Sequence, residues 1–195
     1  MKKVWLIFLS AFLFPAWAGA SQEYLSPPHS LGTTTLSVGE NSLLPPDQNL
    51  GNLDDGDKAT ALAFNSGANP KPWVLVRYGK RAPLKEIQIR NGMANSSAEF
   101  AKYGRVKKIK IILSENRSFE RELKDHPKLQ KISFPPGTEG SWFKVELVEF
   151  YPGPENNKAF LSDLFIDIPK DKDLGGNCLD CKYKNLRSVR GAKGS

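Results

Sequence analysis

Apolar residues that alternate with polar ones fill much of the middle of this chain. In the segment 105–114, Ile109 and Ile111 point to one side of an extended chain, whereas Lys108 and Lys110 point to the other. A period of two residues with one solvated face is typical of an antiparallel sheet. A chain with this pattern buries one face of each strand against a second layer.

Seven or eight runs of this kind, separated by turn residues and without a helical period, predict an all-β sandwich over residues 50–168. The clearest runs are residues 73–78, 84–90, 105–114, 119–123, 132–134, 142–151 and 160–168. The side chains expected between the two sheets are Ile87, Ile89, Ile109, Ile111, Leu113, Val145 and Leu147.

The first 20 residues have the composition of a secretory signal peptide. Lys2 and Lys3 precede an apolar run that ends near Trp17, and small residues follow it. The run is too short to span a bilayer, and no later segment is apolar enough to do so. We therefore expect an exported protein, periplasmic or secreted, that is cleaved after Ala18 or Ala20 and has no transmembrane segment in the mature chain.

The segments on either side of the predicted sandwich differ from it in composition. Residues 21–49 are rich in Ser, Thr, Pro and Gly, which predicts an extended lead-in with one edge strand around Thr33–Val38. Residues 169–195 contain few apolar side chains, which predicts a disordered tail. This tail carries most of the net positive charge of the mature chain, so the sandwich is near neutral and nucleic acid is not an expected partner.

The tail also contains Cys178 and Cys181, spaced as C-x-x-C. In an exported chain, a local disulfide between them is the simplest expectation. A pair of free thiols and half of a zinc site remain alternatives. A thioredoxin-type redox pair is not expected, because the strand and helix that flank such a pair are absent from the pattern.

The sequence between Leu50 and Phe64 contains a compact acidic loop, D-G-D-x-x-T, formed by Asp55, Gly56, Asp57 and Thr60. Carboxylates, carbonyls and a hydroxyl in a tight loop are the ligands that a hard cation prefers, and the glycine lets the backbone curl around it. The loop does not have the spacing of an EF-hand. The alternative is an Asp-Gly turn in which Asp55 caps its own backbone.

Three patches follow one another in a recognisable order: NLDDGDKATA at 52–61, IQIRNG at 87–92 with YGRVKKIKI at 103–111, and VEFYPG at 148–153 with FLSDLFI at 160–166. In this order they resemble the discoidin-like (F5/8 type C-like, galactose-binding-like) β-sandwich. The closest similarity is to the variant that accompanies bacterial NAD glycohydrolase toxins as a translocation domain. The resemblance covers about residues 50–168 and implies an antiparallel jelly-roll topology.

The resemblance also implies one structural Ca²⁺ site. In this chain its ligands would be the side chains of Asp55, Thr60 and Asp163 and the carbonyls of Asn52 and Asp57. Asp163 stands where the family has Glu, and Leu62 stands where the family has Trp, so the sequence departs from the family pattern near this site. A loop held by hydrogen bonds, without a cation, is the alternative.

No residue pattern predicts catalysis. The two histidines, His29 and His126, each lie beside a proline in a loop-like stretch, and neither neighbours a nucleophile elbow. The acidic pairs Glu120/Glu122 and Glu146/Glu149 lie on or beside outward strand faces, where solvated charge explains them. The resemblance is to the accessory domain of the toxins and not to their enzyme domain. We therefore expect a protein that is not an enzyme.

Sugar recognition needs an aromatic ring for stacking together with planar hydrogen-bonding groups. The best such collection in the sequence is Asn91, Asn95, Phe100, Tyr103, Arg105 and Tyr151. The structural alternative is that the aromatic rings plug one end of the sandwich and that Arg105 pairs with an internal carboxylate.

Two functions remain open at this point. The first is an exported binding module that recognises a glycan or a cell-surface component. The second is a structural or delivery protein, in which the sandwich docks another exported protein or assists toxin translocation. A cluster of aromatic, Asn and Arg side chains that lies exposed in one concavity would favour the first, whereas a large flat apolar patch would favour the second.

Overall fold

The computed structural model describes residues 20–25, 34–39, 42–45, 48–154 and 157–167. The signal peptide predicted at 1–20, apart from Ala20, and the tail with Cys178 and Cys181 lie outside these residues. The elements are β1 (Ala20–Leu25), β2 (Thr34–Gly39), η1 (Leu50–Leu53), β3 (Leu62–Asn65), β4 (Trp73–Pro83), β5 (Glu86–Asn91), α1 (Ser97–Lys102), β6 (Gly104–Leu113), β7 (Ser118–Glu122), β8 (Gln130–Ser133), β9 (Glu139–Tyr151) and β10 (Lys158–Asp167).

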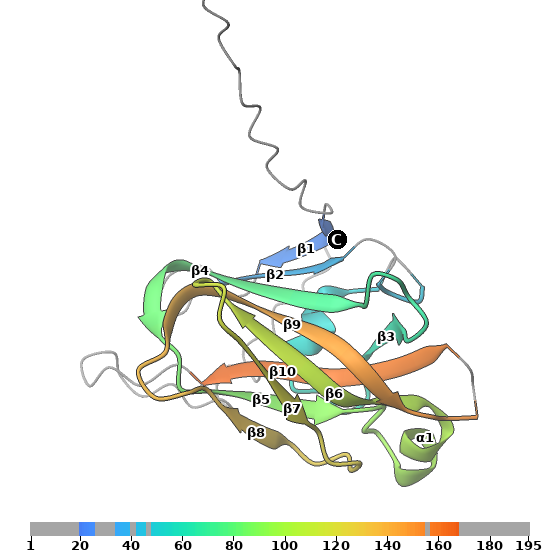
Figure 1. The fold of residues 1–195 in the computed structure, drawn as a ribbon. Coiled ribbons are helices and arrows are strands. Elements are labelled where there is room, and N and C mark those ends of the chain that lie inside the picture. Colours follow the sequence, from blue (N-terminus) through green and yellow to red (C-terminus); the bar gives the residue numbers. More distant parts are fainter. Residues whose placement is uncertain (1–19, 26–33, 40–41, 46–47, 155–156, 168–195) are drawn as a thin grey trace, which may run out of the picture.

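The strands form two layers (Figure 1). One layer has the order β1-β2-β4-β9-β6, with β7 on the far side of β6, and the other contains β10, β5 and β8, with β3 paired to β10. Among the described strands, each pairing is antiparallel except the short parallel contact between β10 and β6, where Ala159 faces Gly104. The predicted all-β sandwich is therefore confirmed.

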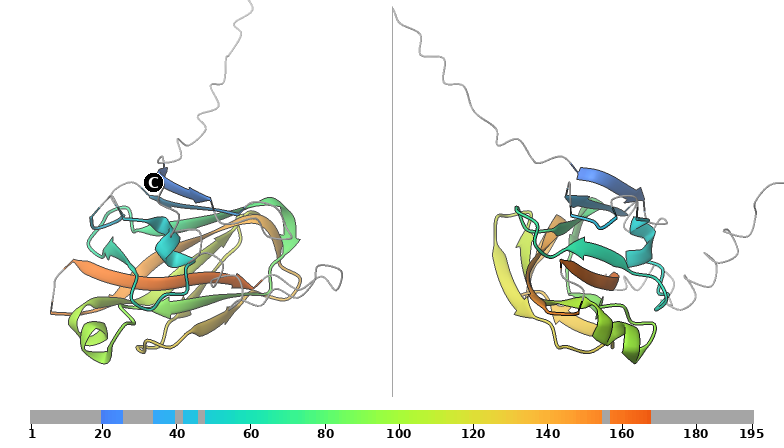
Figure 2. Two further views of the ribbon diagram at one scale, coloured as in Figure 1. Left: turned by 180° about the vertical axis from the view of Figure 1, so that it is seen from behind. Right: turned by 90° about the vertical axis from the view of Figure 1, so that its right-hand side faces the viewer.

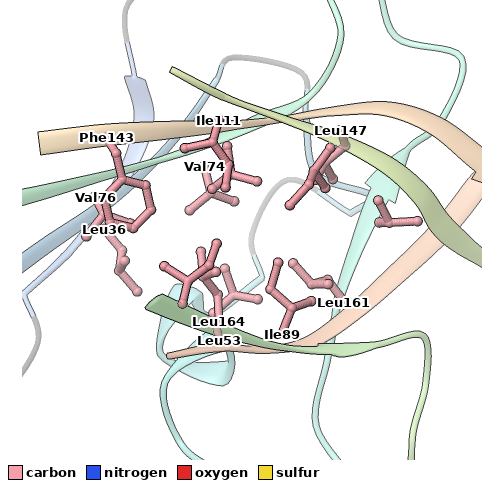
Figure 3. Packing of buried hydrophobic residues seen from close by; sticks show 14 of the residues in the cluster. Leu36, Leu53, Val74, Val76, Ile89, Ile111, Phe143, Leu147, Leu161 and Leu164 are labelled. Atoms are coloured by element: carbon pink, nitrogen blue, oxygen red, sulfur yellow. The ribbon is translucent and has the colours of Figure 1, made fainter. Parts of the chain in front are cut away.

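The core lies between the layers (Figure 3). Phe143, Val74 and Ile111 from one layer face Ile89 and Leu164 from the other. The seven side chains predicted to lie between the sheets are all buried, with at most 1 % exposure. Alternation along β6 and β9 explains most of this result, because each of these strands has one buried and one more exposed face.

The predicted lead-in contributes more to the fold than one edge strand. β2 pairs with β1 on one side and with β4 on the other, and it buries Leu36 and Val38 in the core. We predicted that the sandwich begins at residue 50, but it includes β2 and therefore begins earlier. β2 is difficult to recognise in the sequence, because it lies in a segment rich in Ser, Thr and Gly and only two of its side chains belong to the core.

Two short helical segments interrupt the strands. η1 precedes the acidic loop and lies beside β10, as the view from behind shows (Figure 2). α1 covers one end of the sandwich and begins at Ser96, whose side chain accepts a hydrogen bond from the backbone N–H of Glu99. Serine followed three residues later by glutamate is a capping-box pattern, and this signal in the sequence predicts the start of such a helix.

The solvated face of β6 and β9 consists of charged residues of both signs. The Lys108 Nζ lies 2.5 Å from a carboxylate oxygen of Glu149, and Lys144 pairs with Glu146 at 2.7 Å. The predicted outward position of these charges is confirmed.

Leu129 is the one large apolar side chain that is exposed among the described residues. In that part of the chain, no helix is long and apolar enough to cross a membrane.

Candidate functional site

The acidic loop is held by its own hydrogen bonds. The Asp55 carboxylate accepts from the backbone N–H of Asp57 at 2.9 Å and from the Thr60 hydroxyl at 2.9 and 3.0 Å. The Thr60 Oγ also lies 3.0 Å from the Asp57 carbonyl oxygen, and Gly56 has a φ of 69°. A φ in this range is unfavourable for residues with a Cβ atom, so the glycine permits the curl of the loop.

Asp163 joins this loop from the opposite end of the sequence. It faces Arg90 in the register of β10 and β5, and its side chain is fully buried. One guanidinium nitrogen of Arg90 lies 2.5 Å from Asp163 Oδ2. The other oxygen, Oδ1, has no hydrogen-bond partner within the described residues.

Burial raises the pKa of Asp163 to about 7. The Arg90 charge opposes this rise, as does the nearby backbone N–H of Gly56. The nearby carboxylate of Asp55 adds to the rise, and Asp54 does so to a smaller extent. The electrostatic contact with Asp55 shows that the fold brings the two carboxylates of the predicted metal site together. The balance of these effects leaves Asp163 able to hold a proton near neutral pH.

The arrangement does not fit a Ca²⁺ ion well. Calcium takes six to eight oxygen ligands and is favoured by several unpaired carboxylates. Here, Arg90 already supplies a positive charge to Asp163, and Thr60 is engaged with Asp55. The hydrogen bonds of Asp55 and Thr60 hold the loop as the alternative to a metal site predicts, whereas Asp163 Oδ1 remains without a hydrogen-bond partner within the described residues.

At the other candidate site, Arg105 is the centre of a packed corner. Its Nε and one terminal nitrogen bind both oxygens of Asp125, at 2.9 and 2.7 Å. The other terminal nitrogen donates to the carbonyl oxygens of Tyr103 and Pro152, at 2.9 and 3.0 Å. Four hydrogen bonds leave this guanidinium little capacity for a ligand, so its first role is structural.

The aromatic side chains of the corner pack around Arg105. The guanidinium carbon lies 5.2 Å from the centre of the Phe100 ring and 5.9 Å from that of Tyr151. Tyr103 packs against Phe160 with ring centres 4.5 Å apart. All three of the predicted aromatic residues are partly exposed, so each ring has a packed portion and a solvated portion.

The two predicted asparagines have different environments. Asn91 is fully buried, and its amide donates to the Val106 carbonyl oxygen at 2.6 Å and accepts from the Val106 N–H at 2.9 Å. It thus joins β5 to β6 as a backbone pair would, and it does not reach the surface. Asn95 is exposed and donates to Glu99 at 3.2 Å.

Sequence reasoning missed two features of this corner. The sequence predicts an internal carboxylate as an alternative partner for Arg105, but it does not identify Asp125 as that partner. Two glycines also allow the close packing: a Cβ on Gly153 would lie 2.2 Å from the Tyr103 carbonyl carbon, and one on Gly104 would lie 2.4 Å from the Lys158 carbonyl oxygen. In the sequence, the only sign of this contact is that a glycine follows shortly after each tyrosine, in Tyr151-Pro152-Gly153 and in Tyr103-Gly104.

A family model for the NAD glycohydrolase translocation F5/8 type C domain matches residues 33–167. The chain belongs to this family. The match confirms the resemblance seen in the three sequence patches, and its start at residue 33 agrees with the inclusion of β2 in the sandwich. A search of curated proteins found no match.

Solved structures of a carbohydrate-binding module, a putative chitobiase fragment and a glycosyltransferase share this fold. GH31 CBM32-2 bound to GalNAc has a TM-score of 0.50 at 14 % identity, covering 73 % of this chain and 97 % of that one. A putative chitobiase fragment from Bacteroides thetaiotaomicron has a TM-score of 0.51 at 13 % identity, covering 68 % and 88 %. The mycobacterial arabinofuranosyltransferase AftD has a TM-score of 0.54 at 14 % identity, covering 75 % of this chain but 11 % of that one. At these identities the comparison shows a shared fold.

Proposed function

We propose that this translocation-family sandwich is an exported, non-catalytic binding module that recognises a glycan or another cell-surface component. The single observation that supports this most is the partly exposed aromatic cluster on a rigid corner beside α1. The fold shared with carbohydrate-binding modules, one of them solved with GalNAc, agrees with this proposal.

The binding surface that we propose consists of Asn95, Phe100, Lys102 and Tyr103 on and around α1, with Tyr151 beside them. Asn95 and Lys102 are exposed and can hydrogen-bond to hydroxyl groups. The exposed portions of the rings offer apolar contact to a sugar, although the Lys102 Nζ already lies 4.9 Å from the centre of the Tyr103 ring. Arg105 and Asn91 are part of the support beneath this surface. They position the surface and do not contact the ligand.

The charge distribution of the described residues supports a role without catalysis. Glycoside hydrolysis needs two carboxyl groups across a cleft. Glu149 pairs with Lys107 and Lys108, and Glu146 pairs with Lys144, on a solvated sheet face. Asp163, the buried carboxyl with a raised pKa, is enclosed between the loop and Arg90, where a substrate cannot reach it.

A glycan array probed with the protein tests this proposal. We expect binding to a limited set of glycans, and we expect Tyr103→Ala to weaken that binding at least about tenfold, since tenfold corresponds to the loss of about 1.4 kcal/mol of contact. Phe119→Ala is the matched control. Phe119 is also partly buried and lies beneath a cation, Arg121, as Tyr103 lies beneath Lys102, but it is on β7. Absence of any glycan binding, or equal losses in both variants, would contradict the proposal.

A second candidate function comes from the family itself. The family description associates this domain with the translocation of NAD glycohydrolases, so the sandwich could dock a partner protein. The described surface has one large exposed apolar side chain, Leu129, which favours the glycan reading over a broad apolar docking face. Co-purification of a stoichiometric exported partner, unaffected by Tyr103→Ala, would favour this second function.

A further inference from the structure

The carboxylates of the acidic loop and of Asp163 need a cation or a proton nearby to balance their negative charges. Asp54 and Asp55 lie close enough to Asp163 to affect it electrostatically, and Asp163 is fully buried. Carboxylates that approach one another away from water repel unless a cation or a proton lies among them. A sandwich that brings such groups together from opposite ends of its sequence therefore keeps Asp163 ionised only where a counter-charge lies beside it.

The guanidinium of Arg90 is placed to supply it. Its side chain is 12 % exposed, and it contacts Asp163 Oδ2 at 2.5 Å across the β5–β10 pair. The strand register fixes this contact, because Arg90 and Asp163 are direct cross-strand partners on the same face of the sheet. Unlike a bound ion, this cation is covalently part of the fold.

The bulge in β10 explains why the carboxylate reaches this position. The register shifts between Leu161 and Asp163, so Ser162 is the additional residue. The buried Ser162 hydroxyl donates to the Gly92 carbonyl oxygen at 2.8 Å and accepts from the Ala94 N–H at 3.3 Å. These bonds anchor the bulge and direct Asp163 toward Arg90 and the acidic loop.

We propose that Arg90 is the built-in counter-ion of the acidic loop and takes the place of a structural Ca²⁺ ion in this sandwich. The loop of residues 54–60 and Asp163 thereby keeps its conformation without a metal. This inference concerns the stability of the fold and does not depend on the proposed glycan function.

The test compares melting temperatures in EDTA and in millimolar CaCl₂, at constant ionic strength, for the protein and for Arg90→Gln. The unaltered protein should show a shift below about 1 °C. Arg90→Gln should melt lower in EDTA and should recover by about 3–6 °C in calcium, as expected when a cation binds the native state at a concentration well above its dissociation constant. The double variant Arg90→Gln with Asp163→Asn should lose this recovery.

Two outcomes would overturn the proposal. One is a calcium-induced rise in the unaltered protein as large as in Arg90→Gln, since calcium would then be the counter-ion despite Arg90. The other is a folded Arg90→Gln variant with no calcium response. If Arg90→Gln does not fold in either condition, Arg90→Lys replaces it: a retained positive charge should give a folded protein with a calcium shift below about 1 °C, and a shift of several degrees would contradict the proposal.

Discussion

Asn91→Leu is expected to lower the free energy of unfolding by about 3–5 kcal/mol. The substitution keeps a similar size but removes both hydrogen bonds to the backbone of Val106. Because this position is fully buried, the Val106 N–H and C=O would lose their partners without gaining water, at about 1–3 kcal/mol for each group. Urea denaturation monitored by fluorescence measures the change.

Asn95→Leu is the matched control, because Asn95 was predicted for the same ligand site from the same residue type. It is exposed and has one side-chain hydrogen bond, to Glu99, at 3.2 Å. We expect a change within about 0.5 kcal/mol. Equal effects at the two positions would show that Asn91 does not join β5 to β6 as described.

Arg105→Met is expected to lower the free energy of unfolding by about 2–4 kcal/mol. Arg105 is 11 % exposed and makes four hydrogen bonds, two of them to Asp125 and two to backbone carbonyls. Methionine replaces the packing between the aromatic rings but none of these bonds, so two backbone carbonyls lose their donor. The Asp125 side chain is 36 % exposed, so water solvates its carboxylate and the lost ion pair adds little. Thermal and urea unfolding both report the loss.

Arg81→Met provides the comparison for Arg105. Arg81 also pairs with two groups, Glu115 and Glu139, but its side chain is 56 % exposed. Exposed ion pairs contribute at most about 1 kcal/mol, and often nothing measurable. A loss at Arg81 as large as at Arg105 would contradict the assignment of Arg105 as the structural centre of the corner.

The sandwich could be predicted from the sequence because two of its long strands, β6 and β9, alternate over much of their length. The buried row Ile109, Ile111 and Leu113 is visible as a period of two, and the same holds for Val145 and Leu147. β2 was harder to place, since a short strand with two core side chains in a Ser/Thr-rich segment carries a weak pattern. α1 lies in a loop-length segment, and its signal is one capping box and not an apolar face.

The candidate sites could be predicted only in part, for a different physical reason. Residue types and a family resemblance indicate which groups can gather, and the fold does bring Asp55 and Asp163 together, as well as Phe100, Arg105 and Tyr151. What the side chains do there depends on long-range partners. The pairing of Arg90 with Asp163 and that of Arg105 with Asp125 cross 73 and 20 residues of sequence, and no local pattern encodes them.

These partners also change the role of the predicted residues. Asn91 and Arg105 are suitable in kind for sugar recognition, but their hydrogen-bonding groups are engaged within the protein. They form a rigid support, and the partly exposed rings with Asn95 and Lys102 form the surface that remains for a ligand. Pre-organised support of this kind limits the entropy lost when a ligand binds.

Amide chemical-shift mapping tests the central claim most directly. A glycan identified on the array is titrated into ¹⁵N-labelled protein, and the shifts are followed residue by residue. We expect saturable shifts that concentrate at residues 95–103 and around Tyr151, with residues 118–122 of β7 unchanged. Shifts that concentrate on β7 or β8, with residues 95–103 unchanged, would contradict a glycan-binding surface at the α1 corner.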